Sequence, residues 1–246
     1  MTLPRLRAPI VLVHGLFGFA QLRIGSWVLT DYFHGVPQAL AEAGNRPLVA
    51  RLSPTDGIAE RAEQLRDFIR ASSPDEPVHV VAHSMGGLDA RHMISLLGMA
   101  EKVLTLTTLG TPHRGSPFAD WGLSRLGKLV GPVFDTLRLP RRAFDDLTVT
   151  QCKAFNDQTP DVPTVRYFSI AGRLEGSIWR NPSWRLSAPI VEKAEGASDG
   201  VVSVQSATWG ETLDVWEGDH MALINFPTKP VHPGYAPMLD RLRGCE

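Results

Sequence analysis

A serine stands at the centre of the segment Ala-His-Ser-Met-Gly, residues 82–86. An apolar run precedes this segment and a helix-like stretch follows it, at residues 77–81 and 87–97. A strand that turns sharply into a helix holds a serine hydroxyl clear of the backbone, and small residues must flank it because strand and helix approach closely. The pattern therefore favours Ser84 as the nucleophile of an acyl transfer over the alternative, an ordinary surface serine in a small-residue turn.

A serine nucleophile needs a general base, which a histidine supplies. Of the eight histidines, only His220 and His232 lie late enough in the chain, since the order at such sites is serine, acid, histidine. We favour His220, which follows an apolar run ending at Trp216 by four residues, over His232, which lies away from any expected strand end. His83 and His113 are interpreted as structural residues.

The acid of such a site holds the imidazole in one tautomer and stabilises its charged form. We select Asp199, because Gly200 permits a tight turn that points the carboxylate back at the histidine. Glu175 is the second choice, as it lies closer to the end of an expected strand. Asp219 is adjacent to His220 in the chain, where neighbouring side chains point apart, and is discounted. The alternative for Asp199 is a surface Asp-Gly turn.

Acyl transfer also requires N–H donors for the developing oxyanion. One donor is expected to be the backbone N–H of Met85, at the start of a helix. The other is expected in the loop 14–18 after the first strand, with Leu16 preferred and Phe17 as the alternative. His14 is interpreted as fixing this loop rather than taking part in the reaction.

The elements that must position these residues alternate between strands and helices. Continuous apolar or β-branched runs predict six strands, at 10–13, 48–52, 78–82, 103–109, 165–171 and 213–216. A helix is predicted over 56–71, where the apolar residues Ile58, Ala62, Leu65 and Ile69 are spaced by 4, 3 and 4. Charged residues lie between them in the sequence: Glu60, Arg61, Glu63 and Arg66. This alternation predicts one α/β domain over residues 1–246, with a mainly parallel sheet flanked by helices.

Residues 112–160 are too long for an ordinary connection between two strands. Helical spacing is shown by Leu123, Leu126, Val130, Phe134 and Leu137, and the charges are mostly basic: Arg125, Lys128, Arg138, Arg141 and Arg142 against Asp135. We interpret about 116–155 as a helical insertion, with two alternatives: a mobile lid over an acyl pocket that meets a lipid surface, or a fixed cap. A second insertion, 172–198, is interpreted as a loop that can carry a hairpin.

Composition limits the class of protein. The chain has 246 residues, is 43% hydrophobic and carries a formal net charge of −1, so nothing indicates binding to nucleic acid. No apolar run is long enough to span a membrane, and the first residues do not resemble a signal peptide. We expect a cytoplasmic protein, or a secreted one if this is a mature form. Cys152 and Cys245 are expected to be free thiols.

Five segments of the chain resemble one family, in the right order: residues 9–19, 82–87, 109–116, 198–203 and 219–221. They are similar to the bacterial triacylglycerol lipases of the Pseudomonas and Burkholderia type, in the α/β-hydrolase superfamily. The alanine at the start of the 82–86 segment resembles the small Bacillus lipases. The resemblance implies a triad of Ser84, Asp199 and His220, oxyanion donors at Leu16 and Met85, and an ester or lipid substrate.

One departure from the family concerns metal. Those enzymes bind a structural calcium with an acid two residues after the catalytic histidine, where this chain has Ala222. We therefore expect no calcium there, and no cofactor or other metal. The expected function is a lipase acting on acylglycerols, with a lipid–water interface as its partner. The alternatives are a short-chain carboxylesterase, an acyltransferase or thioesterase, and a lipid-binding module without catalysis.

Overall fold

A six-stranded sheet forms the centre of the protein in a computed structural model that describes residues 2–16, 21–24, 27–125, 141–175, 182–226 and 230–246. Its strands, in spatial order, are β4 (Pro47–Val49), β1 (Ile10–Val13), β5 (Val78–His83), β6 (Val103–Leu109), β7 (Arg166–Arg173) and β8 (Glu211–Glu217). Every neighbouring pair is parallel. All six predicted strands are confirmed, with ends shifted by a few residues at most.

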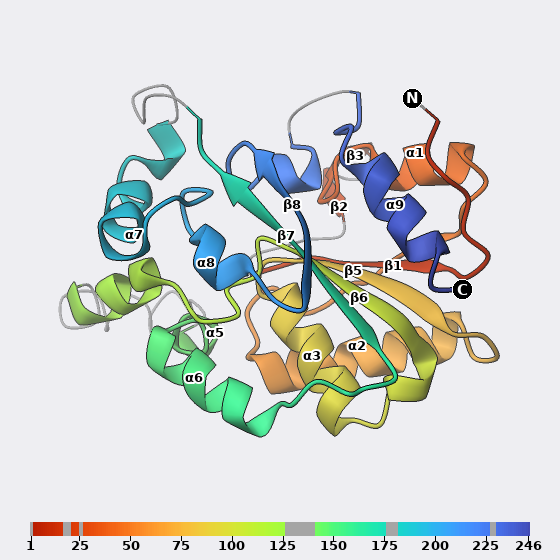
Figure 1. Cartoon of the computed structure of the whole chain (residues 1–246), viewed down its shortest axis with the longest axis horizontal. Helices are drawn as coiled ribbons and strands as arrows, with labels where there is room; N and C mark the ends of the chain where they lie inside the picture. Colours follow the sequence, from red (N-terminus) through yellow and green to blue (C-terminus); the bar gives the residue numbers. More distant parts are fainter. Residues whose placement is uncertain (1, 17–20, 25–26, 126–140, 176–181, 227–229) are drawn as a thin grey trace.

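Helices cover both faces of the sheet (Figure 1). Helices α1 (Val36–Glu42) and α9 (Tyr235–Arg243) lie on one face, and α2 (Ile58–Ser72) and α3 (Gly86–Leu96) on the other. The fully buried strand β1 explains this arrangement, because successive side chains of a strand point to opposite faces. Ile10 and Leu12 join the apolar cluster beneath α1 and α9, whereas Val11 and Val13 join the cluster beneath α2 and α3.

The apolar face predicted for α2 is confirmed, since all four of its predicted apolar residues are buried. Arg61, one of the charged residues between these apolar positions, is also fully buried. Its guanidinium forms an ion pair with the buried Asp89 of α3 and donates to backbone carbonyls, so its charge is paired rather than solvated.

Several elements were not predicted. Between β1 and α1 lies an antiparallel pair, β2 (Gln21–Ile24) and β3 (Trp27–Asp31). The hairpin interpretation of 172–198 is wrong in the described residues, which form the short helix η3 (Pro182–Trp184) and α7 (Ser187–Glu195). The other elements are η1 (Ala100–Lys102), α5 (Arg141–Asp145), α6 (Val149–Gln158), α8 (Val204–Ala207) and η4 (Ala222–Ile224).

The long connection after β6 contains several helices in its described part. Residues 117–125 form a helix, and α5 and α6 follow on the far side of the gap. Four of the five residues that carry the predicted helical spacing, Leu126, Val130, Phe134 and Leu137, lie outside the described residues, as does Arg138. The choice between lid and fixed cap, and the division into domains, therefore stay predictions.

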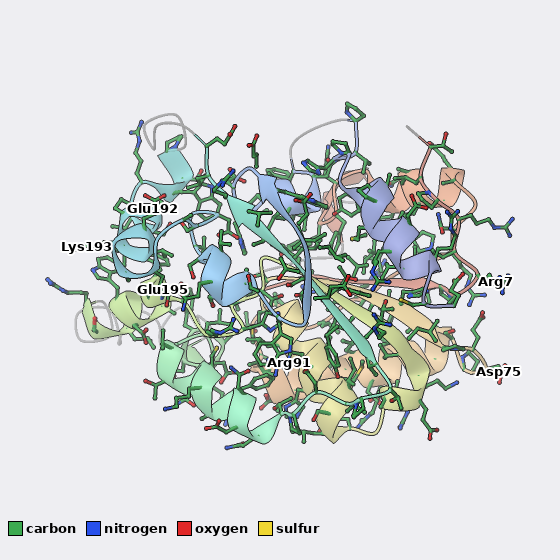
Figure 2. All side chains as sticks on the ribbon, viewed as in Figure 1. Arg7, Asp75, Arg91, Glu192, Lys193 and Glu195 are labelled. Carbon is green, nitrogen blue, oxygen red and sulfur yellow. The ribbon has the colours of Figure 1, made fainter. Side chains whose placement is uncertain are left out.

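Arg91 anchors this helical region to α3. Its guanidinium stacks 3.7 Å from the ring centre of Trp209 and donates to Asn156 in α6. Figure 2 shows Arg91 in the interior, while Arg7, Asp75 and Lys193 project from the edges of the molecule. No helix in the described part of the chain is long and apolar enough to cross a membrane. Cys152 and Cys245 are free, as predicted.

Candidate active site

Ser84 lies in a strained turn between β5 and α3. Its φ angle is 55°, in the left-handed region that residues other than glycine rarely adopt. The turn is held by a hydrogen bond of 2.9 Å from the Ser84 N–H to the carbonyl of Leu109 in β6. Gly86 is required next to it, because a Cβ atom there would lie 2.9 Å from the carbonyl oxygen of His14. The strand–turn–helix geometry predicted for residues 82–86 is therefore present.

The predicted acid and base are in contact. The Nδ1 atom of His220 lies 2.6 Å from Oδ2 of Asp199. The other carboxylate oxygen of Asp199 accepts the backbone N–H groups of Val201 at 3.0 Å and Val202 at 2.8 Å. Gly200 makes this turn possible with a φ of 102°. Asp199 is fully buried, so its carboxylate interacts with these N–H groups instead of water.

The two acids that the sequence argument ranked below Asp199 serve elsewhere. Glu175 is on the surface, where a hydrogen bond with Glu217 and the charge of this second carboxylate raise the pKa of Glu175. Asp219 accepts the N–H groups of Met221 and Ala222, which begins the short helix η4. His232 stacks on Trp216, with ring centres 4.3 Å apart. Only Asp199 contacts His220 among these candidates.

The imidazole of His220 lies next to the Ser84 turn. The rings of His83 and His220 have centres 4.4 Å apart, and His83 immediately precedes the serine. The Ser84 hydroxyl makes no hydrogen bond to any described residue, and His220 is no exception. In the absence of substrate such bonds are often long and tighten only in the complex.

The two predicted oxyanion donors flank the serine. Met85 occupies the position just before α3, where helix N–H groups lack partners within the helix. Leu16 follows Gly15, and Gly15 touches the turn so closely that a Cβ atom on it would lie 2.7 Å from the Ser84 Cβ. Leu16 is half-buried and packs against a cluster that includes Met85. Phe17, the alternative donor, lies outside the described residues.

The loop that carries Leu16 is fixed from below by a buried ion pair. Arg61 Nε lies 2.8 Å from Asp89 Oδ2, and both side chains are fully buried. The same guanidinium donates to the carbonyl oxygen of His14 at 2.7 Å. The ring of His14 accepts the N–H of Leu52 at 3.1 Å, and burial lowers the pKa of His14 to about 4, so this histidine is neutral. His14 thus fixes the loop, as predicted.

Sequence reasoning missed Arg61, Asp89, Tyr32 and Trp184. A signal existed for Arg61, which is three residues after Ile58 and four before Leu65 and therefore shares the apolar face of α2. Tyr32 gives no local signal, because its role depends on contacts with residues far away in the chain. Trp184 packs edge-on against His220, with ring centres 6.3 Å apart, from within the insertion interpreted as a loop.

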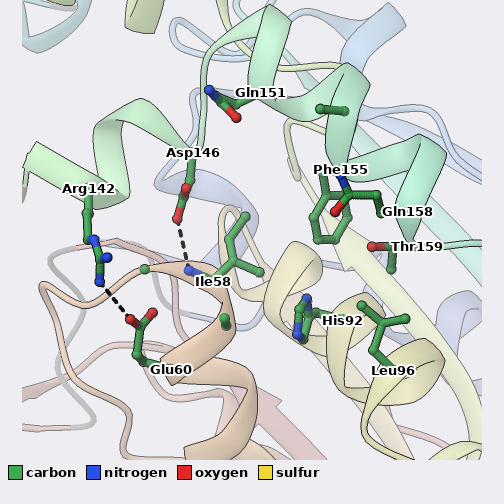
Figure 3. Close-up of a pocket in the computed structure, with 13 residues that line it drawn as sticks. Ile58, Glu60, His92, Leu96, Arg142, Asp146, Gln151, Phe155, Gln158 and Thr159 are labelled. Carbon is green, nitrogen blue, oxygen red and sulfur yellow. Dashed lines mark hydrogen bonds and ion pairs between the residues drawn. The ribbon is translucent and has the colours of Figure 1, made fainter.

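A separate cavity of about 350 Å³ lies between α2 and α3 on one side and α5 and α6 on the other (Figure 3). Its lining includes Glu60, His92, Asp146 and Phe155, and its rim carries an ion pair of 2.9 Å between Arg142 and Glu60. None of Ser84, Asp199 and His220 lines it. The cavity therefore lies apart from the site built around the serine.

The calcium site expected from the family does not fit the residues present. Ala222, at the position where those enzymes have a carboxylate, has no side-chain oxygen and begins η4. No group of three or more His, Cys, Asp or Glu side chains in the described part of the chain is arranged to hold a metal ion.

Comparisons with known proteins show the family of this chain. The family model of the PGAP1-like alpha/beta domain matches residues 56–212, which is more than half of the chain. A triacylglycerol lipase of Vibrio cholerae is 39% identical over 270 residues, covering 92% of this chain and 84% of that protein. The chain belongs to the bacterial triacylglycerol lipase family.

Two further relatives show how widely this family extends. Triacylglycerol lipase 2 of Saccharomyces cerevisiae is 32% identical over 81% of this chain, which spans 64% of the yeast protein. The crystal structure of the mature Bacillus licheniformis lipase BlEst2 superposes with a TM-score of 0.77 at 26% identity, covering 94% of this chain and 91% of that one. Family membership makes the chain a serine hydrolase with lipase or esterase activity, and its substrate a lipid ester.

Proposed function

We propose that Ser84, Asp199 and His220 form the catalytic triad of this lipase and that its substrates are acylglycerols. The observation that carries the proposal is the 2.6 Å contact between His220 and Asp199 beside the strained turn of Ser84. Asp199 holds Nδ1 of His220 as the N–H nitrogen, which leaves Nε2 free to accept the serine proton. The Pseudomonas and Burkholderia type, with a Bacillus-like alanine at position 82, is the finer assignment within this proposal.

The reaction proceeds through two acyl transfers. His220 takes the proton of the Ser84 hydroxyl as the serine oxygen attacks the ester carbonyl, and the carbonyl oxygen becomes an oxyanion. His220 then gives that proton to the leaving alcohol, and the acyl group stays on Ser84. A water molecule, deprotonated by His220, attacks the acyl-enzyme in the same way and releases the fatty acid.

The oxyanion is stabilised by the backbone N–H groups of Met85 and Leu16. Met85 contributes the unpaired N–H of a helix N-terminus, where the helix dipole also favours negative charge. Each such donor lowers the barrier by roughly 3 kcal/mol in measured cases. Contact with a lipid–water interface stays a prediction from the composition of 112–160, since residues 126–140 lie outside the described part.

The test is a set of initial hydrolysis rates across p-nitrophenyl esters of increasing acyl length, with Ser84→Ala beside the wild type. The variant should lose on the order of a million-fold in kcat. A wild-type maximum at long chains supports a lipase acting on acylglycerols, whereas a maximum at short chains means a carboxylesterase. Near-normal hydrolysis by Ser84→Ala would remove this serine from the mechanism.

Ser95→Ala is the matched control, because Ser95 lies on the same helix, α3, but near its other end. It should hydrolyse every ester at the wild-type rate. Product analysis with an added alcohol separates hydrolysis from acyl transfer, since free fatty acid should dominate. A dominant transesterified product would favour the acyltransferase alternative.

A further inference from the structure

Two buried side chains connect the loop after β1 to the histidine of the triad. The N–H of Gly15 donates to the hydroxyl oxygen of Tyr32 at 3.1 Å. That hydroxyl lies 2.7 Å from Nδ1 of His83. On the other side of the ring, Nε2 of His83 lies 2.9 Å from the carbonyl oxygen of His220. Three hydrogen bonds thus join segments that are more than 200 residues apart in the chain.

The directions of these bonds follow from the groups at the two ends. A backbone carbonyl only accepts, so Nε2 of His83 must carry the proton and Nδ1 must be the bare nitrogen. The Tyr32 hydroxyl then donates to Nδ1 and accepts from Gly15. Burial lowers the pKa of His83 well below its usual range and raises that of Tyr32 to about 12, so both groups stay neutral. The tautomer of His83 and the directions of these three bonds are therefore fixed by their partners.

We propose that Tyr32 and His83 are positioning residues that couple the oxyanion loop at Gly15 to the backbone of His220. The inference rests on the proposed function, because it takes His220 as the general base and Leu16 as an oxyanion donor. In this proposal neither Tyr32 nor His83 exchanges a proton with Ser84 or the substrate. They act through the two backbone segments that carry the donor and the base.

The coupling matters because the oxyanion donor in the loop at Gly15 and the imidazole of His220 must both be correctly placed at the same step of the reaction. The oxyanion donor is useful only where the carbonyl oxygen arrives, and the imidazole only where the serine proton leaves. The ring of His83 also packs against the ring of His220, with ring centres 4.4 Å apart and the planes tilted by 45°, so a shift of one ring displaces the other. Tyr32 is 8% exposed and His83 fully buried, which leaves water little access to replace a lost bond.

The test compares two tyrosine variants that lose the same kind of bond. Tyr32→Phe should lower kcat roughly tenfold to a hundredfold, as small misplacements of catalytic groups do, with KM within about twofold of wild type. Tyr167→Phe is the matched control, since its hydroxyl also accepts a backbone N–H at 3.1 Å, from Val162, near the start of β7. It should keep the wild-type kcat. Equal kcat values for the two variants would overturn the proposal.

His83 supplies an independent test through rescue. Glutamine can accept with its oxygen and donate with its nitrogen, so His83→Gln should preserve most of the kcat, whereas His83→Leu should lose it to at least the extent of Tyr32→Phe. In a protein that already carries Tyr32→Phe, adding His83→Leu should lower kcat much less than His83→Leu does alone, because the hydrogen-bonded path from Gly15 to His220 is already interrupted. If the two losses of kcat simply multiply in the double variant, the two residues do not act through the same path.

A spectroscopic measurement on the unmodified protein avoids any variant that fails to fold. Ring nitrogen NMR should show His83 protonated at Nε2 and bare at Nδ1, the tautomer that the three bonds require. A proton on Nδ1 of His83 would overturn the proposal that Tyr32 and His83 couple the two segments. The two proposals can fail separately. Wild-type activity in Ser84→Ala would refute the proposed triad. An inactive Ser84→Ala together with a fully active Tyr32→Phe would refute only the positioning role of Tyr32 and His83.

Discussion

Asp199 and Asp89 are both fully buried, yet their surroundings differ. Asp199 accepts three N–H groups, two from the backbone and one from His220, at 3.0, 2.8 and 2.6 Å. Asp89 has one partner, the Nε of Arg61 at 2.8 Å, and its second oxygen has no hydrogen-bond partner among the described residues. One carboxylate is held by a turn, and the other by a single opposite charge.

The difference distinguishes Asp199, a carboxylate of the candidate active site, from Asp89, a carboxylate that holds Arg61 in place. The turn around Asp199 stabilises a charge with fixed backbone dipoles and leaves one oxygen directed at the imidazole. At Asp89, desolvation outweighs the attraction of Arg61 and raises the pKa of the carboxyl to about 7. The value of that pair lies in the arginine, whose remaining N–H groups hold the carbonyls of Ser53 and His14. Buried charge alone therefore does not mark a catalytic acid.

The largest expected effect is on catalysis. Asp199→Asn keeps the size of the side chain but removes the charge that holds His220 in the required tautomer, so kcat should fall roughly a thousandfold to ten-thousandfold. Asp89→Asn is the matched change at the other buried carboxylate and should stay within about tenfold of wild type, because Asp89 contacts no reacting group. Steady-state rates on one ester measure both. A similar loss of kcat in the two variants would contradict the assignment of Asp199, and not Asp89, to the reaction.

The next effect is on stability and concerns the ion pair. Arg61→Met leaves Asp89 buried without its counter-charge and should reduce the free energy of unfolding by about 3–5 kcal/mol. Replacing both partners, in Arg61→Met with Asp89→Leu, should be less destabilising than Arg61→Met alone, because no uncompensated charge remains. Urea unfolding curves of the three proteins provide the comparison. If the double variant is the least stable, the pair contributes more than mutual neutralisation.

The same contrast explains how far the sequence could be interpreted. The six strands followed from continuous apolar runs, because a parallel sheet covered on both faces buries nearly every side chain. Ser84, Asp199 and His220 were each found from local features: a small-residue turn, an Asp-Gly pair and a histidine just after a strand. The contact between Asp199 and His220, and the place of His220 beside the Ser84 turn, need only that parallel strands end at one edge of the sheet.

What the sequence did not reveal depends on contacts between distant segments. Charged residues such as Arg61 are usually exposed, and the burial of Arg61 depends on Asp89 of the neighbouring helix, which the sequence of α2 does not reveal. Tyr32 and His83 lie on a path from Gly15 to His220 whose four members are far apart in the chain. The helix α7 was missed because residues 187–195 lack a clear apolar period, and only three of them are buried.

The smallest expected effect is a pH dependence of stability at Asp89. In the unfolded chain this carboxyl titrates near 3.8, whereas burial raises its pKa to about 7 in the folded protein. Between those values the folded state binds more protons than the unfolded state, so this group makes the free energy of unfolding fall as pH rises, and its contribution is constant above about 7.

Asn has no proton to lose, so the free energy of unfolding of Asp89→Asn minus that of wild type should increase from pH 5 to pH 7 and then level off. Urea unfolding at four pH values gives this difference directly, with all other titrating groups common to both proteins. A difference that decreases with pH would mean that Arg61 overcomes desolvation and holds Asp89 ionised, which would make the two carboxylates alike in charge although only one of them contacts His220.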